Sequence, residues 1–226
     1  MRGYNLTMCE RFYRTATAAE IRKQFKIQQV PALVPHYNIA PPQTAPIIIA
    51  QGKGRELRLA RWGLVPPWSR DLSLATRMIN APAETLAERA AYNTPFQSQR
   101  CLVPANGFYE WQSHGAKKQP YKIALRNGAL IAFAGLWEKW TPDSGAPVET
   151  FTIITTAASK LVSEVHDRVP VIIAPGDYQL WLTASPATAR KLLVPYASGL
   201  ALTPISERVN SIENNDVGLL LPLSMS

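Results

Sequence analysis

Two residue types that often build sites are scarce in this chain of 226 residues. It has only two cysteines, Cys9 and Cys101, and three histidines. A secreted disulfide scaffold would contain more cysteines, so both are expected to be reduced thiols in the cytoplasm. Since no C-x-x-C or H-x-x-x-H spacing occurs, a structural zinc site is not expected, and we predict neither a metal nor another cofactor.

Long apolar runs are also missing. None approaches the roughly 20 residues that cross a bilayer. The opening stretch MRGYNLTM has one arginine and no apolar centre, unlike a secretory signal. The composition, 46% hydrophobic and 18% charged, is that of a folded globular protein. The sequence therefore predicts a soluble cytoplasmic protein with no membrane partner.

Acidic residues are outnumbered. Against 24 lysines and arginines stand 16 acidic residues, a net charge of +8. An excess of this sign favours a polyanionic partner, with nucleic acid first, although simple solubility is the alternative. No internal repeat or linker is visible, and nothing in the pattern indicates an obligate dimer, so a monomer is expected.

Short elements follow one another along the chain. Thr17 and Glu20 form a capping box before AAEIRKQFKI, an expected amphipathic helix. Pro82 before AETLAERAAY predicts a second helix over roughly 83–92. The strand-like stretches QPYKIALR and ALIAFAGLWEKW flank Asn127-Gly128, which predicts a β-hairpin.

The later part of the chain continues this pattern. TFTIITTAA and RVPVIIA are typical of buried strands, with SKLVSEVH a short helix between them. PGDYQLWL and PATARKLL are expected helical turns. Strands interleaved with short helices predict one α+β domain with a mainly antiparallel, barrel-like sheet.

Cys9 is the first residue that could carry chemistry. A cysteine is usually a small buried hydrophobe. Here, however, it follows Met8, and initiation at Met8 followed by methionine removal would expose Cys9 as the first residue. Its α-amine and thiol would then both be nucleophiles near neutral pH. Such a 1,2-aminothiol attacks an aldehyde through its amine and then closes a thiazolidine ring through its thiol.

Polar residues in two other motifs are candidates. Glu110 lies between Tyr109 and Trp111, where burial would raise the pKa of a general acid or base; the alternative is an edge-strand residue facing water. Asn80 could orient a polar reactant or simply cap a helix.

His166 stands where an expected helix meets a strand, and such boundaries often carry function. Most lone histidines are nevertheless structural. Nearby Arg168, like Arg11, could bind phosphate through its guanidinium or form an ordinary surface ion pair.

Two tryptophans occur in RWGLVPPWSRD. Core packing explains Trp62. Trp68 follows two prolines and is expected to be exposed on a stiff loop, where it could stack on a nucleobase.

Nine stretches in order resemble the SRAP (SOS response-associated peptidase) family: MCERF, HYNIAPPQT, RWGLVPPW, INAPAET, NGFYEW, KKQPYKI, TIITTAA, HDRVPVII and VNS. The likeness runs from about Met8 to Pro222. It implies an α+β SRAP domain that binds single-stranded DNA and traps abasic sites, in the DNA-damage (SOS) response, as a thiazolidine DNA–protein crosslink. The implied location is cytoplasmic, nucleoid-associated when bound to DNA.

The resemblance also implies roles for single residues. Cys9 matches the crosslinking cysteine, and the implied catalytic set is Cys9, Asn80, Glu110 and His166, with Glu110 shuttling protons and His166 assisting sugar-ring opening. The implied DNA contacts are Arg11, Trp68, Trp111, Thr155 and Arg168.

Two positions depart from the family pattern. Glu10 replaces a glycine, which places a carboxylate near the expected phosphate path. Pro82 replaces a phosphate-binding arginine, so DNA affinity should fall and its salt dependence flatten by about one counterion. Arg77 is the expected substitute and completes the DNA-binding set.

The position of Met8 leaves two explanations open. Either Met8 is the true start, or residues 1–8 are a leader removed by the protein's own cysteine-peptidase activity, with residues 9–226 the SRAP domain in both cases. The activity could thus be crosslinking with a lyase-like step or self-cleavage. A third alternative is a non-covalent single-stranded DNA-binding module.

Overall fold

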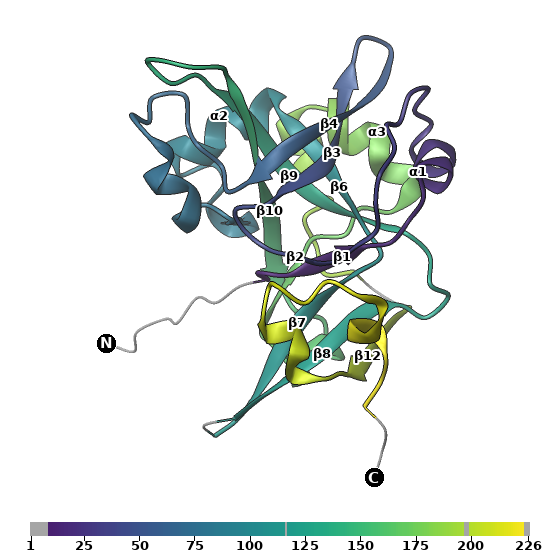
Figure 1. Ribbon diagram of the computed structural model, residues 1–226. Coiled ribbons are helices and arrows are strands. Elements are labelled where there is room, and N and C mark those ends of the chain that lie inside the picture. Colours follow the sequence, from purple (N-terminus) through teal and green to yellow (C-terminus); the bar gives the residue numbers. More distant parts are fainter. Residues whose placement is uncertain (1–8, 116, 197–198, 224–226) are drawn as a thin grey trace.

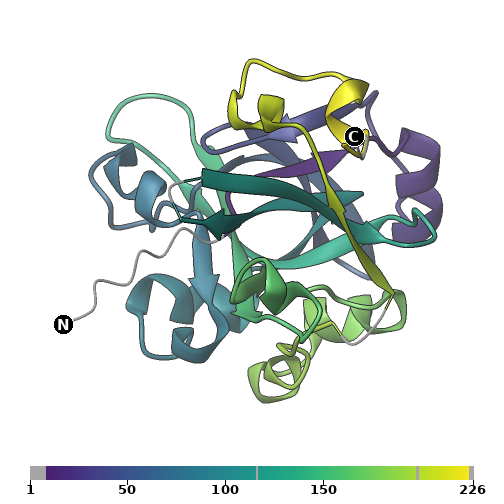
Figure 2. The ribbon, with the colours of Figure 1, turned by 90° about the horizontal axis from the view of Figure 1, so that it is seen from below.

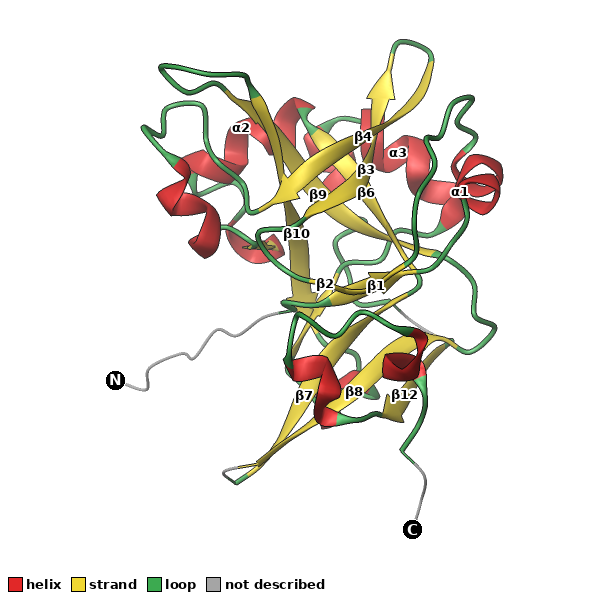
Figure 3. Cartoon of the chain, viewed as in Figure 1, coloured by secondary structure: helices red, strands yellow, loops and turns green. Residues whose placement is uncertain are grey.

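The structure is a computed structural model that describes residues 9–115, 117–196 and 199–223. The predicted leader, residues 1–8, lies outside the described residues. The strands form two sheets, one above the other in Figure 1, and the helices lie around their outside (Figure 3). This confirms the predicted α+β class with a mainly antiparallel sheet.

The smaller sheet has the strand order β12-β8-β7-β1-β2. Every neighbouring pair in it is antiparallel. Its strands are β1 (Phe12–Arg14), β2 (His36–Ile39), β7 (Gly107–His114), β8 (Lys117–Leu125) and β12 (Leu200–Pro204). Because β1 lies between β2 and β7, the residues just before β1 are held beside the middle of this sheet.

The larger sheet has the order β11-β10-β4-β3-β6-β9, with β5 beside β10. β10 also pairs with β9, so five of the strands close into a barrel. The strands are β3 (Thr44–Gln51), β4 (Gly54–Trp62), β5 (Asn80–Pro82), β6 (Arg100–Ala105), β9 (Ile131–Trp140), β10 (Val148–Ala157) and β11 (Arg168–Pro170). Two short pairings, β10 with β4 and β10 with β5, are parallel.

The helices are short and peripheral, as Figure 2 shows from below. The α-helices are α1 (Ala18–Phe25), α2 (Ala90–Ser98), α3 (Tyr178–Thr183) and α4 (Pro186–Arg190). The 3₁₀ turns are η1 (Leu72–Arg77), η2 (Ala83–Thr85), η3 (Val162–Glu164), η4 (Pro175–Asp177), η5 (Glu207–Asn210) and η6 (Val217–Leu220). The capping box of Thr17 and Glu20 is confirmed.

Two apolar clusters make up most of the core. One lies between the barrel and its helices and includes Phe25, Phe96 and Trp181. The other lies between the two sheets and includes Phe12, Trp62 and Cys9. The predicted core role of Trp62 is confirmed, since it is fully buried.

The predicted hairpin around Asn127-Gly128 is wrong in its pairing. Both strands exist and Gly128 has the positive φ of a turn, 68°. However, β8 pairs with β7 and β12, whereas β9 pairs with β6 and β10. The turn therefore passes the chain from one sheet to the other. The first six residues of β9, Ile131–Leu136, are all buried in the barrel, and that burial outweighs local pairing.

The predicted helix over 83–92 is also wrong. Only the single turn η2 forms there, and α2 begins at Ala90. Arg89 has an extended conformation, φ −93° and ψ 115°, which separates the two. The Glu84 side chain is bound to Arg168 on β11, so a tertiary contact replaces helix propensity at this point. SKLVSEVH likewise forms only η3.

Candidate active site around Cys9

Cys9 is the first described residue and precedes β1. Its side chain is fully buried, and its thiol donates a weak hydrogen bond to the Arg11 carbonyl oxygen at 3.7 Å. Burial of the side chain raises the pKa of this thiol well above its usual value. Cys9 is therefore held as a neutral thiol in this structure.

Asn80 is the nearest polar partner of Cys9. It begins β5, which lies parallel to β10 with Asn80 opposite Ile153. The Asn80 Nδ2 donates to the Cys9 carbonyl oxygen at 2.9 Å, and the Asn80 backbone oxygen accepts from Tyr92 at 3.0 Å. Its Oδ1 is buried and has no hydrogen-bond partner. Asn80 is thus not a helix cap, and its amide is free to accept one more bond.

Glu110 lies in the middle of β7, opposite Tyr121 on β8. Its side chain is buried, and Oε1 has no hydrogen-bond partner. Burial raises the pKa of Glu110 well above its usual value, with further contributions from the charges of Glu10 and Asp167. The predicted direction of the shift is therefore confirmed. A buried protonated carboxyl without a partner is able to donate a proton.

A cavity of about 900 Å³ opens beside these residues. Four predicted site residues line it, namely Arg11, Glu110, Trp111 and His166. Its other lining residues are Glu10, Gln112, Ser113, His114, Lys118, Ser163, Glu164, Val165, Asp167 and Asn210. Cys9 is not itself a lining residue, but it lies next to the cavity because its chain neighbour Glu10 lines it.

His166 lies just before β11, and 19% of its side chain is exposed. The backbone N–H of Arg168 donates to His166 Nδ1 at 3.1 Å. The Arg168 carbonyl oxygen at 3.1 Å and Asp167 Oδ1 at 3.4 Å lie near the same nitrogen. Nδ1 therefore has one donor and two acceptors within reach.

Arg11 is bound within the protein. Its Nη1 donates to Asn38 Oδ1 at 3.0 Å and to the Val209 oxygen at 2.8 Å. Its Nη2 donates to the Asn210 oxygen at 3.1 Å. Trp111 is held by the same segment, because its Nε1 donates to Asn210 Oδ1 at 2.8 Å. Three of the five guanidinium N–H groups of Arg11 are therefore already used.

Arg168 and Thr155 contact each other. Arg168 forms a two-point ion pair with Glu84, at 2.7 and 2.9 Å, and donates to the Thr155 carbonyl oxygen at 2.9 Å. Thr155 is fully buried on β10. The structure thus brings these two predicted DNA contacts together, with the charge of Arg168 matched by Glu84.

Trp68 and Arg77 lie away from these contacts. Trp68 is 65% exposed, which confirms the predicted exposed aromatic side chain. Arg77 ends η1 and is exposed, and its guanidinium forms no hydrogen bond or ion pair with any of the described residues. Neither residue lines the cavity beside Glu110.

Sequence reasoning missed three residues that build the site. Asn38 binds the segment that holds Arg11, Glu84 binds Arg168, and Asn210 binds Trp111. Their stretches, HYNIAPPQT, INAPAET and VNS, were among the nine family motifs. Their place in the family motifs could therefore have marked these three residues as candidates. Their binding partners lie far away in the sequence, so only the fold reveals those contacts.

Comparisons with known proteins place the chain. The profile of the family described as "SOS response associated peptidase (SRAP)" matches residues 8–212. The chain belongs to this family. It is 42% identical to the abasic site processing protein YoaM of Bacillus subtilis, over 94% of this chain and 97% of that protein. It is 33% identical to the abasic site processing protein HMCES of Gallus gallus, over 84% of this chain and 67% of HMCES.

Solved structures share the fold of this chain. A crystal structure of a protein from Bacteroides thetaiotaomicron has a TM-score of 0.86 and 27% identity, and the match covers 96% of this chain and 100% of that one. One from Bordetella bronchiseptica has a TM-score of 0.76 and 26% identity, over 88% and 100%.

Two kinds of site are missing from the described residues. They contain no group of three His, Cys, Asp or Glu side chains placed to hold a metal ion. They also include no helix with the length and hydropathy of a membrane span.

Proposed function

We propose that this protein captures the open-chain aldehyde of an abasic site in single-stranded DNA through Cys9. The observation that carries the proposal is the grouping of Cys9, Asn80 and Glu110, with an unpartnered polar atom on each of the last two. Its relatives are abasic site processing proteins, and the net charge of +8 suits a DNA partner.

The chemistry follows from the two nucleophiles of an amino-terminal cysteine. The α-amine of Cys9 adds to the aldehyde carbon, and loss of one water gives an imine. The thiol sulfur then adds to the imine carbon while its proton moves to the nitrogen, which closes a thiazolidine ring. No oxidant, metal or cofactor is consumed.

The residues around Cys9 could donate and accept the protons that these steps transfer. Glu110, kept protonated by burial, would donate to the hydroxyl that leaves as water and would accept a proton later. Asn80 would hold the Cys9 backbone in place through its 2.9 Å hydrogen bond. His166, which lines the cavity, would assist opening of the sugar ring from that side.

Capture requires a free α-amine on Cys9. With residues 1–8 attached, that nitrogen is an amide and imine formation is blocked. Initiation at Met8 with methionine removal would free it, and so would self-cleavage of the Met8–Cys9 bond by the Cys9 thiol. We favour the alternative start, with residues 9–226 as the mature SRAP domain.

DNA would reach the cavity over a surface that includes Trp68, Trp111 and Arg77. Trp68 is exposed for base stacking, and Trp111 lines the cavity. Arg11 has two N–H groups left for phosphate, whereas Arg168 would first have to share its guanidinium with Glu84. We propose that the protein binds as a monomer.

Intact-protein mass spectrometry tests this function directly. The protein starting at Cys9 is incubated with a short single-stranded oligonucleotide that carries one abasic site. A stable mass increase equal to the oligonucleotide minus one water is expected. The same protein with Cys9→Ser should bind the oligonucleotide without a mass increase. An unchanged mass for the unmodified protein would leave a non-covalent DNA-binding module as the function.

A further inference from the structure

A second cavity, of about 300 Å³, lies next to the first. Its walls are mostly apolar and include Trp62, Ile79 and Ile212. The remaining lining residues are Glu10, Arg11, Ala40, Pro41, Pro42, Ala75 and Thr76. Glu10 and Arg11 line both cavities, so the two cavities adjoin at the residues that follow Cys9. The small volume and mostly apolar walls suit one ring system rather than a larger group.

Glu10 is the acidic side chain in the lining of this second cavity. It is partly exposed, and within the described part of the chain its carboxylate has neither a hydrogen bond nor an ion pair. An unpaired carboxylate repels phosphate and attracts N–H donors. A group that contacts the Glu10 carboxylate should therefore present an N–H edge rather than a phosphate group.

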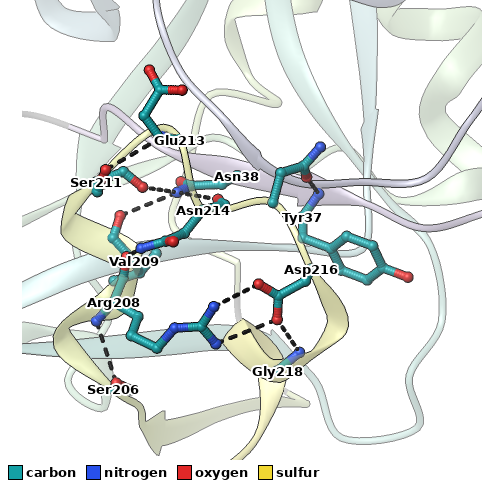
Figure 4. Close-up of polar contacts among 11 residues, drawn as sticks. Tyr37, Asn38, Ser206, Arg208, Val209, Ser211, Glu213, Asn214, Asp216 and Gly218 are labelled. Atoms are coloured by element: carbon teal, nitrogen blue, oxygen red, sulfur yellow. Dashed lines mark hydrogen bonds and ion pairs between the residues drawn. The ribbon is translucent and has the colours of Figure 1, made fainter.

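Asn38 holds in place the segment that carries Ile212, one of the residues that line this cavity. Figure 4 shows Asn38 inside the turn formed by residues 208–214. Its Nδ2 contacts the backbone oxygens of Val209, Ser211 and Asn214 at 3.2, 3.0 and 3.1 Å. This turn carries Ile212, which is 45% exposed and faces the cavity. Arg208, at the start of the turn, is paired with Asp216 at 2.7 Å, which fixes the segment further (Figure 4).

We propose that this second cavity binds the nucleobase next to the abasic site, and that Glu10 makes the protein prefer guanine and disfavour thymine there. The proposal rests on the proposed function, because it assumes that an abasic nucleotide occupies the neighbouring cavity. Glycine stands at the matching position of the family pattern.

The order of bases follows from their Watson–Crick edges, which are free in a single strand. Guanine presents two parallel N–H donors, N1–H and N2–H, that fit both oxygens of one carboxylate. Adenine and cytosine present one amino group. Thymine has a single N–H between two carbonyl oxygens, which the Glu10 carboxylate would repel. The apolar walls, including Ile212, would contact the faces of any base and so contribute affinity without selectivity.

Fluorescence anisotropy with single-stranded oligonucleotides would test the preference. Each oligonucleotide carries one tetrahydrofuran abasic analogue, which has no aldehyde, flanked on one side by guanine or thymine. Both sides are tested in turn. From the strength of a two-point carboxylate contact, we expect about fivefold or tighter binding of the guanine oligonucleotide on one side.

The readout is the ratio of dissociation constants, since loss of a negative charge raises affinity for any DNA. Glu10→Gln should bring the guanine-to-thymine ratio close to one. Glu88→Gln removes an equivalent charge from an exposed side chain outside both cavities and should leave the ratio unchanged. Ile212→Ala should weaken binding to both oligonucleotides equally.

Two results would overturn the proposal: equal binding of the two oligonucleotides by the unmodified protein, or a ratio that survives Glu10→Gln. A mass-spectrometric test with a true abasic site, run in parallel, separates the two hypotheses. A base preference without a mass increase would refute covalent capture and keep the base subsite. A mass increase without a base preference would support covalent capture and refute the base subsite.

Discussion

The side-chain amide of Asn80 donates a 2.9 Å hydrogen bond to the backbone oxygen of Cys9, across 71 positions of the sequence. Asn80 is placed by the short parallel pairing of β5 with β10, and Cys9 by the strand β1 that follows it. The bond therefore joins the two sheets at the residue whose amine and thiol would react. Because both partners are buried, the bond is expected to matter for stability as well as for chemistry.

Asn80→Ala should lower both stability and crosslinking rate. The buried Cys9 oxygen would lose its donor, which costs about 1–3 kcal/mol. Thermal unfolding and the time course of the mass increase measure the two effects. Asn93→Ala is the matched control, since Asn93 also donates one hydrogen bond, to the Ala87 oxygen, but at the surface. Equal losses in both variants would contradict a special role for Asn80.

Glu110→Gln should stabilise the protein increasingly as pH rises. The pKa of Glu110 is raised by burial, so the folded state keeps a proton that the unfolded state releases above about pH 4.3. The protein therefore loses stability between that value and the higher folded pKa, while a glutamine, which cannot ionise, loses none. Melting temperatures at pH 4 and pH 8 test this.

The gain from Glu110→Gln should be near zero at pH 4 and larger at pH 8. Exposed Glu88→Gln serves as control and should show no such trend. The same substitution should slow crosslinking, because glutamine cannot transfer a proton. A gain that does not change with pH would show that Glu110 is ionised in the folded protein.

Trp68→Ala should weaken single-stranded DNA binding without changing the melting temperature. Its side chain is 65% exposed, so it contributes little to the core, and stacking on one base is worth about 1–3 kcal/mol. Trp62→Ala provides the contrast, since that side chain is fully buried and donates to the Ile79 oxygen at 2.8 Å. It should lower the melting temperature strongly. Unchanged DNA affinity for Trp68→Ala would exclude stacking there.

Local signals in the sequence predicted several elements but not their partners. The capping box at Thr17, the strands β8, β9 and β10 and the burial of Trp62 all follow from short-range patterns, and each is confirmed. The turn at Gly128 was also predicted, yet the strands on either side join different sheets. Pairing depends on which surfaces are buried, and no local pattern encodes that.

In the candidate site, too, the sequence predicted single residues but not the residues that contact them. Motifs identified Cys9, Asn80 and Glu110, and the fold brings the first two into contact. What sequence alone did not reveal is the set of partners: Glu84 on Arg168, and Asn38 behind Arg11. These contacts join segments that lie far apart in the chain, so they become visible only when the sheets are assembled.

Pro82→Arg should strengthen single-stranded DNA binding and steepen its salt dependence. Pro82 ends β5 opposite Thr155, beside the Arg168 whose charge is paired with Glu84. An arginine here would add one free cation, which changes the slope of log affinity against log salt by about 0.7 for a single strand. Anisotropy titrations between 50 and 200 mM salt measure it. Pro175→Arg, at an exposed proline outside both cavities, controls for charge alone.

Arg77→Gln is the complementary change and should flatten the same slope by a similar amount, since Arg77 is exposed and makes no hydrogen bond or ion pair among the described residues. If Arg77 takes over the missing phosphate contact, the double variant with Pro82→Arg should return close to the original slope. An unchanged slope in Arg77→Gln would show that the phosphate path avoids η1. In that case the lost contact would have no substitute, and Pro82→Arg alone would still raise the slope.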